Sequence, residues 1–238
     1  MEAERAARQE AGPKRLAIEV EALEKSYQGP EGPQPVLSGL DLAVAPGETI
    51  AVLGVSGTGK STLLNILGGI DYADGGTVRV NGREVTALSP RELTRYRAES
   101  VGFIFQFYNL ISGLTAFENV LTALQALRRT TREDEAKCRD VLDSVWLAEK
   151  ADKFPGQLSG GEQQRVAIAR TLVKASPLIL ADEPTGNLDP HTADSVMQLL
   201  TERVRESHAS MVMVTHDHAA TKYTDRAYEV TDGHLVER

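Results

Sequence analysis

The sequence predicts an α/β fold with a mainly parallel central sheet. Short apolar runs that are typical of strands alternate with helical segments, which favours parallel strands joined by crossover helices. One such run, residues 48–53, ends directly in a glycine-rich turn, and a helix is expected after that turn. The chain has 238 residues, of which 41% are hydrophobic. It is therefore long enough for one large domain, or for one domain with an inserted subdomain.

The N-terminal part is expected to be antiparallel. Residues 1–15, MEAERAARQEAGPKR, are charged and rich in alanine, lack the apolar core of a signal peptide and predict a disordered tail. Residues 16–24 alternate apolar and polar side chains, as an antiparallel edge strand does. Residues 28–35, QGPEGPQP, hold three prolines and two glycines and predict a loop. The domain is therefore expected to span residues 16–238.

The remaining elements follow from apolar runs and helical periodicity. Strands are expected at residues 36–44, 48–53, 76–80, 101–105, 178–181 and 211–215, with one last strand-like segment at 230–238. Helices are expected at residues 60–67, 158–170 and 190–206, the first of them ended by Gly68 and Gly69. Residues 115–146 are also helical in pattern, which predicts an inserted helical subdomain over about residues 107–157.

The glycine-rich turn, GVSGTGKS, matches the phosphate-binding P-loop pattern between a predicted strand and a predicted helix. Glycines let the backbone wrap closely around phosphate oxygens, which its N–H groups can then bind. Lys60 is expected to reach the β- and γ-phosphates, Ser61 to bind Mg²⁺ and Thr62 to lie near the α-phosphate. The candidate nucleotide ligands are Gly54, Val55, Ser56, Gly57, Thr58, Gly59, Lys60, Ser61 and Thr62. The motif by itself indicates only nucleoside triphosphate binding, because kinases, GTPases and helicases share it.

The most informative stretch is residues 158–189, LSGGEQQRVAIARTLVKASPLILADEPTGNLD. It predicts a helix that opens at Ser159, Gly160 and Gly161, and a helix start can hold a phosphate through its N–H groups and its dipole. The alternative is a well-capped helix, in which Ser159 is the N-cap and Glu162 the acid of the first turn.

The helix is followed by a short apolar strand that ends in two adjacent acids, Asp182 and Glu183. Such a pair can hold a divalent cation and polarise a water molecule. A solvated strand end is the alternative reading. A second apolar strand ends at His216, which is expected to lie beside this acid pair, whereas the nearby His218 belongs to no motif.

Together these motifs resemble the Walker A, signature and Walker B motifs of the ABC ATPases. The resemblance implies a P-loop NTPase core of the ABC ATPase type, with an antiparallel β subdomain and an inserted α-helical subdomain. It also implies that the chain binds ATP and Mg²⁺ and hydrolyses ATP. By the same resemblance, Asp182 contacts the metal together with Ser61 and Gln106, Glu183 is the general base for the attacking water, and His216 contacts the γ-phosphate. Gln106 lies in VGFIFQFYNL, where a strand leaves the core, and is also implied to contact the attacking water.

The resemblance assigns three further contacts to ATP. Tyr27 is similar to the aromatic residue that stacks on adenine. Ser159 to Gly161 are implied to bind the nucleotide of a second subunit, which Asp189, in PTGNLD, also approaches. The family pattern therefore implies a dimer with two ATP molecules at a two-fold interface.

ADEPTGNLD, GGEQQRVAIAR, LGGID and VGFIFQFYNLISGLTAFENV are similar to the MacB and LolD group of ABC transporters. This resemblance implies a separate membrane permease, docked near residues 107–117, and a place at the cytoplasmic face of the inner membrane. FtsE-like ATPases of cell division are the alternative. A binding cassette that closes on ATP without hydrolysing it is disfavoured by the presence of Glu183 and His216. An ABC ATPase of DNA repair is disfavoured because the sequence has no coiled coils or zinc insertions.

Composition supports this assignment. The formal net charge is −8, so no global basic field favours nucleic acid. No apolar run is long enough for a transmembrane helix. The single cysteine, Cys138, excludes an intramolecular disulfide and fits a reducing compartment.

Overall fold

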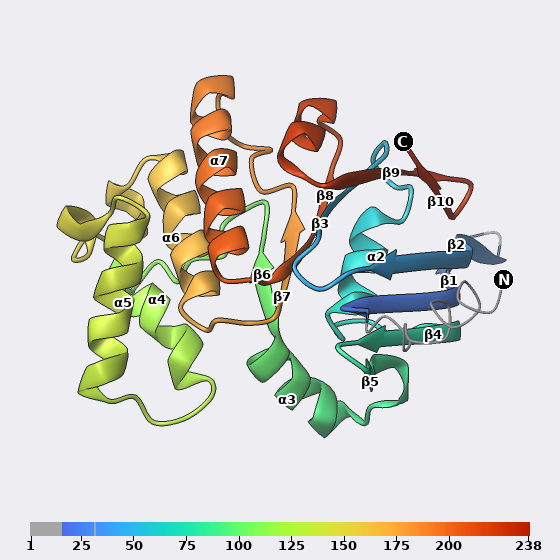
Figure 1. Cartoon of the computed structure of the whole chain (residues 1–238), viewed down its shortest axis with the longest axis horizontal. Coiled ribbons are helices and arrows are strands. Elements are labelled where there is room, and N and C mark those ends of the chain that lie inside the picture. Colours follow the sequence, from blue (N-terminus) through green and yellow to red (C-terminus); the bar gives the residue numbers. More distant parts are fainter. Residues whose placement is uncertain (1–15, 31) are drawn as a thin grey trace, which may run out of the picture.

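The computed structural model describes residues 16–30 and 32–238, so the tail predicted at residues 1–15 lies outside the described residues. Two sheets form the fold, one mainly parallel and one antiparallel (Figure 1). The six-stranded sheet has the order β10-β9-β3-β8-β7-β6, in which only β10 is antiparallel to its neighbour. Its strands are β3 (Thr49–Leu53), β6 (Val101–Ile104), β7 (Leu178–Asp182), β8 (Ser210–Thr215), β9 (Arg226–Thr231) and β10 (His234–Glu237). The predicted mainly parallel α/β core is confirmed.

The second sheet has four antiparallel strands in the order β2-β1-β4-β5. They are β1 (Ile18–Gly29), β2 (Gly32–Val44), β4 (Gly75–Val80) and β5 (Arg83–Glu84). The helices are α2 (Lys60–Leu67), α3 (Pro90–Ser100), α4 (Ala116–Gln125), α5 (Arg132–Ser144), α6 (Gly160–Leu172) and α7 (Pro190–Glu206). Figure 1 shows α4 and α5 on the opposite side of the molecule from the antiparallel sheet, packed against α6.

The parallel sheet separates two hydrophobic cores, and alternate residues of each central strand enter opposite ones. In β8, Met211 and Met213 join the core under α4–α7, while Val212 and Val214 join the core shared with α2 and the antiparallel sheet. Both faces of these strands are therefore buried, which explains their continuous apolar runs.

Two predictions about the N-terminal strands are wrong. β1 lies between β2 and β4 and is not an edge strand. Residues 28–35 are not a loop, because β1 continues to Gly29 and β2 begins at Gly32, with the chain reversing between them. Pro33 and Pro35 are part of β2, which is at the edge of its sheet, the position at which proline is tolerated in a strand.

One prediction about the C-terminal strands also needs correction. The last strand-like segment, 230–238, is not one strand: it contains the end of β9, the turn at Asp232 and Gly233, both with positive φ, and β10, which pairs with β9. The helical pattern predicted at 115–146 is confirmed by two helices, α4 and α5. Helix α3 was not predicted, although Ser89 and Glu92 form the capping box that marks its start. The helices predicted at residues 60–67 and 190–206 are confirmed.

Candidate nucleotide-binding site

The candidate site lies at the carboxyl ends of three neighbouring parallel strands, β3, β8 and β7. Leu53 pairs with Thr215, and Asp182 with Val214, so the residues that follow these strands meet at one edge of the sheet. A cavity of about 790 Å³ opens there. It is lined by Tyr27, Val36, Val55, Ser56, Gly57, Gly59, Lys60, Ser61, Thr62, Gln106, Asp182, Glu183 and His216. The structure thus gathers most of the predicted site residues around one cavity.

The phosphate loop holds its lysine against its own backbone. Lys60 Nζ donates to the carbonyl oxygens of Gly54, at 2.6 Å, and Val55, at 2.7 Å. Burial lowers the pKa of Lys60, and the nearby charges of Asp182 and Glu183 oppose that shift. Gly54 and Thr58 belong to the loop without lining the cavity. The ammonium group is therefore held against the backbone of the loop, beside the cavity that Lys60 lines.

Gly59, the last loop residue before α2, is required by its conformation and by its neighbours. Its φ of 98° is left-handed, and a Cβ placed there would come within 2.8 Å of Val36 Cγ1. No side chain caps the helix at this position. The first N–H groups of α2 therefore face the cavity without a side-chain partner at the N-cap.

Asp182 and Ser61 form an oxygen pair that fits a magnesium ion. Ser61 Oγ lies 3.4 Å from Asp182 Oδ1 at the edge of the cavity. Burial raises the pKa of Asp182, Glu183 adds to the shift, and Lys60 opposes it. Magnesium takes oxygen ligands, commonly one or two from the protein with the rest from phosphates and water, and this pair suits that pattern.

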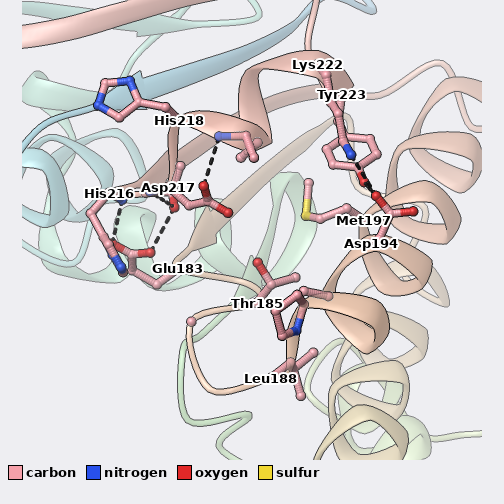
Figure 2. Close-up of a pocket in the computed structure, with 16 residues that line it drawn as sticks. Glu183, Thr185, Leu188, Asp194, Met197, His216, Asp217, His218, Lys222 and Tyr223 are labelled. Atoms are coloured by element: carbon pink, nitrogen blue, oxygen red, sulfur yellow. Dashed lines mark hydrogen bonds and ion pairs between the residues drawn. The ribbon is translucent and has the colours of Figure 1, made fainter.

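Glu183 and His216 lie in direct contact (Figure 2). Glu183 Oε1 accepts from the backbone N–H of His216 at 3.0 Å and lies 2.8 Å from its Nδ1, while Oε2 accepts from Thr215 Oγ1 at 2.9 Å. The Glu183 side chain is 13% exposed and that of His216 is 65% exposed. The carboxylate is therefore well fixed, whereas the imidazole is open to solvent or to a ligand.

A second cavity, of about 630 Å³, adjoins the first at Glu183 and His216 (Figure 2). On its far side Asp194, in α7, accepts hydrogen bonds from Lys222 and Tyr223. These contacts fasten the short 3₁₀ segment His218–Tyr223, which follows His216, to α7.

Tyr27, in β1, and Gln106, which follows β6, also line the first cavity. Tyr27 donates its hydroxyl hydrogen bond to Asp71 at 2.7 Å, and Lys25 Nζ lies 5.1 Å from the ring centre. The backbone carbonyl of Gln106 accepts from Asn187 Nδ2 at 2.7 Å. Lys25, Asp71 and Asn187 were not predicted, because no local pattern marks a residue that contacts a site residue from a distant part of the chain.

The start of α6 lies away from this cavity, since none of Ser159, Gly160 and Gly161 lines it. The predicted capping box is confirmed: Ser159 Oγ accepts from the Glu162 N–H, and Glu162 accepts from the Ser159 N–H. A Cβ on Gly161 would lie 2.4 Å from Thr192 Cγ2 of α7.

Asp189 is also outside the cavity and is the N-cap of α7, where it accepts from the Thr192 N–H.

Comparisons with known proteins identify the family. The ABC transporter family model matches residues 37–186, which is more than half of the chain. The chain belongs to the ABC transporter ATPase family. It is 44% identical over 218 residues to the lipoprotein-releasing system ATP-binding protein LolD 2 of Caulobacter vibrioides, covering 92% of this chain and 96% of that protein. It is 44% identical to the macrolide export ATP-binding/permease protein MacB of Marinobacter nauticus, covering 94% of this chain and 34% of that protein.

Solved structures agree. A dimeric ATP-binding cassette in a post-hydrolysis state, bound to ADP and Pi, superposes with a TM-score of 0.85 at 37% identity, covering 93% of this chain and 97% of that chain. The protein is therefore an ABC ATPase of the LolD/MacB type, an ATP-hydrolysing, nucleotide-binding subunit of an ABC transporter. These matches give no support to the FtsE-like alternative. Within the described residues, no helix of this ABC ATPase is both long and apolar enough to cross a bilayer.

Proposed function

We propose that this ABC ATPase closes as a homodimer around two ATP molecules and drives a separate membrane permease, in lipoprotein or lipid extraction or in export. The observation that carries the proposal is the separation of the two phosphate-binding features. The P-loop, Asp182 and Glu183 share one cavity, whereas Ser159 to Gly161 do not line it. A two-fold dimer brings the second feature of each subunit onto the nucleotide of the other.

The proposed chemistry follows from the cavity. Lys60 and the N–H groups of the loop hold the phosphates, and Tyr27 offers its ring to the adenine. Ser61, Asp182 and Gln106 hold Mg²⁺, which supplies charge neutralisation at the phosphates when it is bound. Glu183 orients the attacking water and accepts its proton, and the exposed His216 contacts the γ-phosphate.

The proposed permease contact lies at residues 107–117, directly after Gln106. Phe107 is 71% exposed and Ile111 is 52% exposed, so this segment offers apolar surface beside the cavity. Docking there would couple a membrane partner to the residue that senses the γ-phosphate. We place the subunit at the cytoplasmic face of the inner membrane through this partner. Helices α4 and α5, in the stretch 107–157, are proposed to move with that contact as a subdomain.

The test replaces the proposed general base. Glu183→Gln keeps the shape of the side chain but removes its basicity, so kcat should fall about 100-fold or more while ATP binding is retained. Size-exclusion chromatography with ATP and Mg²⁺ should then show an accumulated dimer. The control is Glu202→Gln, an exposed acid on α7, which should hydrolyse ATP normally. A Glu183→Gln protein that stays monomeric and keeps hydrolysing ATP would refute the proposal.

A further inference from the structure

The backbone of Glu183 is held in a left-handed conformation at the end of β7. Its φ is 44°, which is uncommon for a residue with a side chain and marks a strained backbone. The Glu183 N–H donates to the carbonyl of Val214 at 2.9 Å, so the turn is fastened to β8. The turn thereby brings the carboxylate over the carboxyl end of β8, where Thr215 and His216 follow Val214.

Thr215 is the last residue of β8 and is 3% exposed. Its hydroxyl accepts from the Asp217 N–H at 3.0 Å. Because that N–H group can only donate, the hydroxyl hydrogen of Thr215 is free to be donated to Glu183 Oε2, 2.9 Å away. The direction of both hydrogen bonds is thus fixed by chemistry.

The two carboxylate oxygens of Glu183 are hydrogen-bonded to groups that differ in how firmly the fold holds them. Oε2 is held by a hydroxyl on β8, a strand that pairs on both sides, with β3 and with β7. Oε1 is held by the backbone N–H and the ring of His216, which has left the strand and is largely exposed. When the imidazole turns toward a ligand, Thr215 and one backbone N–H group still define the orientation of the carboxylate.

We propose that Thr215 is a positioning residue for ATP hydrolysis, which aims the Glu183 carboxylate at the attacking water through its hydroxyl. The inference rests on the proposed role of Glu183 as general base. A buried hydroxyl is costly without a hydrogen-bond partner, whereas valine would fill the same place in the sheet. The alternative is that this hydroxyl only stabilises the turn at Asp217, which it also contacts.

The experiment removes the hydroxyl and keeps the shape. Thr215→Val should lower kcat about 10- to 100-fold, since a small misplacement of a catalytic group costs up to that much, while the Kd for ATP stays within about twofold. Thr215→Ser keeps the donor and should restore kcat to within about threefold of the unchanged protein. Thr201→Val is the matched control, because the buried Thr201 hydroxyl bonds only to carbonyls of its own helix, and its kcat should not change.

The outcomes separate this inference from the proposed function. If Glu183→Gln is inactive and Thr215→Val has a normal kcat, the inference fails and the proposed function stands. If Glu183→Gln hydrolyses ATP normally, the proposed function fails. A raised Kd for ATP with unchanged kcat in Thr215→Val, or an equal loss of kcat in Thr201→Val, would assign the hydroxyl to the fold. Should Thr215→Val not fold, Thr215→Cys, a weaker donor of similar size, should show a reduced kcat, and a normal value would overturn the inference.

Discussion

The helices α2 and α6 both begin at a glycine motif, yet their first turns are built in opposite ways. At the start of α2, Gly59 has a left-handed backbone, no side chain caps the helix, and the first turn contains no acid. At the start of α6, Ser159 and Glu162 form a complete capping box. The first helix start faces a cavity lined by the acids and the lysine of its own chain, and the second does not.

The difference shows that glycines at a helix start can either shape a loop for a ligand or allow close packing against another helix. In α2, glycine shapes a loop whose N–H groups are left for phosphate, so the ligand completes the structure. In α6, the capping box occupies the N–H groups of Ser159 and Glu162, and the lack of a side chain at Gly161 leaves room for Thr192 of α7. Because its first turn is already capped, the α6 start can contact a second subunit without a change in its own conformation.

The largest expected effect comes from adding bulk and charge to the α6 start. Ser159→Arg should block dimer closure and lower ATP hydrolysis about 100-fold, while ATP binding by the P-loop is retained, because the proposed contacts to the partner's phosphates would be lost. ATPase assays and binding of a fluorescent ATP analogue measure the two effects. Ser89→Arg is the matched control, since Ser89 forms the same capping box at α3. Normal hydrolysis by Ser159→Arg would mean that α6 does not serve a second nucleotide.

A smaller effect is expected where α6 meets α7. Gly161→Ala should lower the free energy of unfolding by about 1 kcal/mol, because an overpacking cost of about 2 kcal/mol against Thr192 exceeds the gain in helix propensity of about 1 kcal/mol. Urea unfolding measures the change, and Thr192→Ser in the same chain should restore it. Gly156→Ala, which meets no atom within 4 Å, is the control. Unchanged stability in Gly161→Ala would show that packing does not require this glycine.

The smallest effect concerns the charge beside the α2 start. Burial holds the pKa of Asp182 above its ordinary value of 3.8, so in the absence of nucleotide and Mg²⁺ its ionisation opposes folding at neutral pH. Asp182→Asn should therefore raise Tm by about 1–3 °C at pH 7.5, although hydrolysis is lost. As pH falls through the raised pKa of Asp182, the unchanged chain loses this cost, and the difference in Tm should disappear.

Thermal scans in EDTA between pH 7.5 and 4 measure this difference. Asp143→Asn, an acid near the end of α5, is the control and should show no such pH-dependent gain. A difference in Tm that grows as the pH falls would contradict the assignment of Asp182 as a carboxylate destabilised by burial.

Local chemistry explains which parts were predictable. The helices at residues 60–67 and 190–206 were predicted with their observed bounds because each has a clear start: a P-loop in the first, and Asp189 before Pro190 in the second. The β1–β2 hairpin was missed because prolines normally exclude strands, and only the position of β2 at a sheet edge makes them acceptable. Helix α3 was also missed, although Ser89 and Glu92 have the spacing of a capping box.

The sequence by itself determined the family and the parallel core and named the candidate site residues, since P-loop glycines, paired acids and capping boxes are recognised over a few neighbouring positions. Only the tertiary structure decided which of them meet. Strand order brings Lys60, Asp182, Glu183 and His216 to one cavity and leaves Ser159 to Gly161 outside it. The tertiary structure also places Thr215 against Glu183, and Asp71 against Tyr27. These contacts join residues far apart in the chain, and their geometry depends on how strands pair and layers pack.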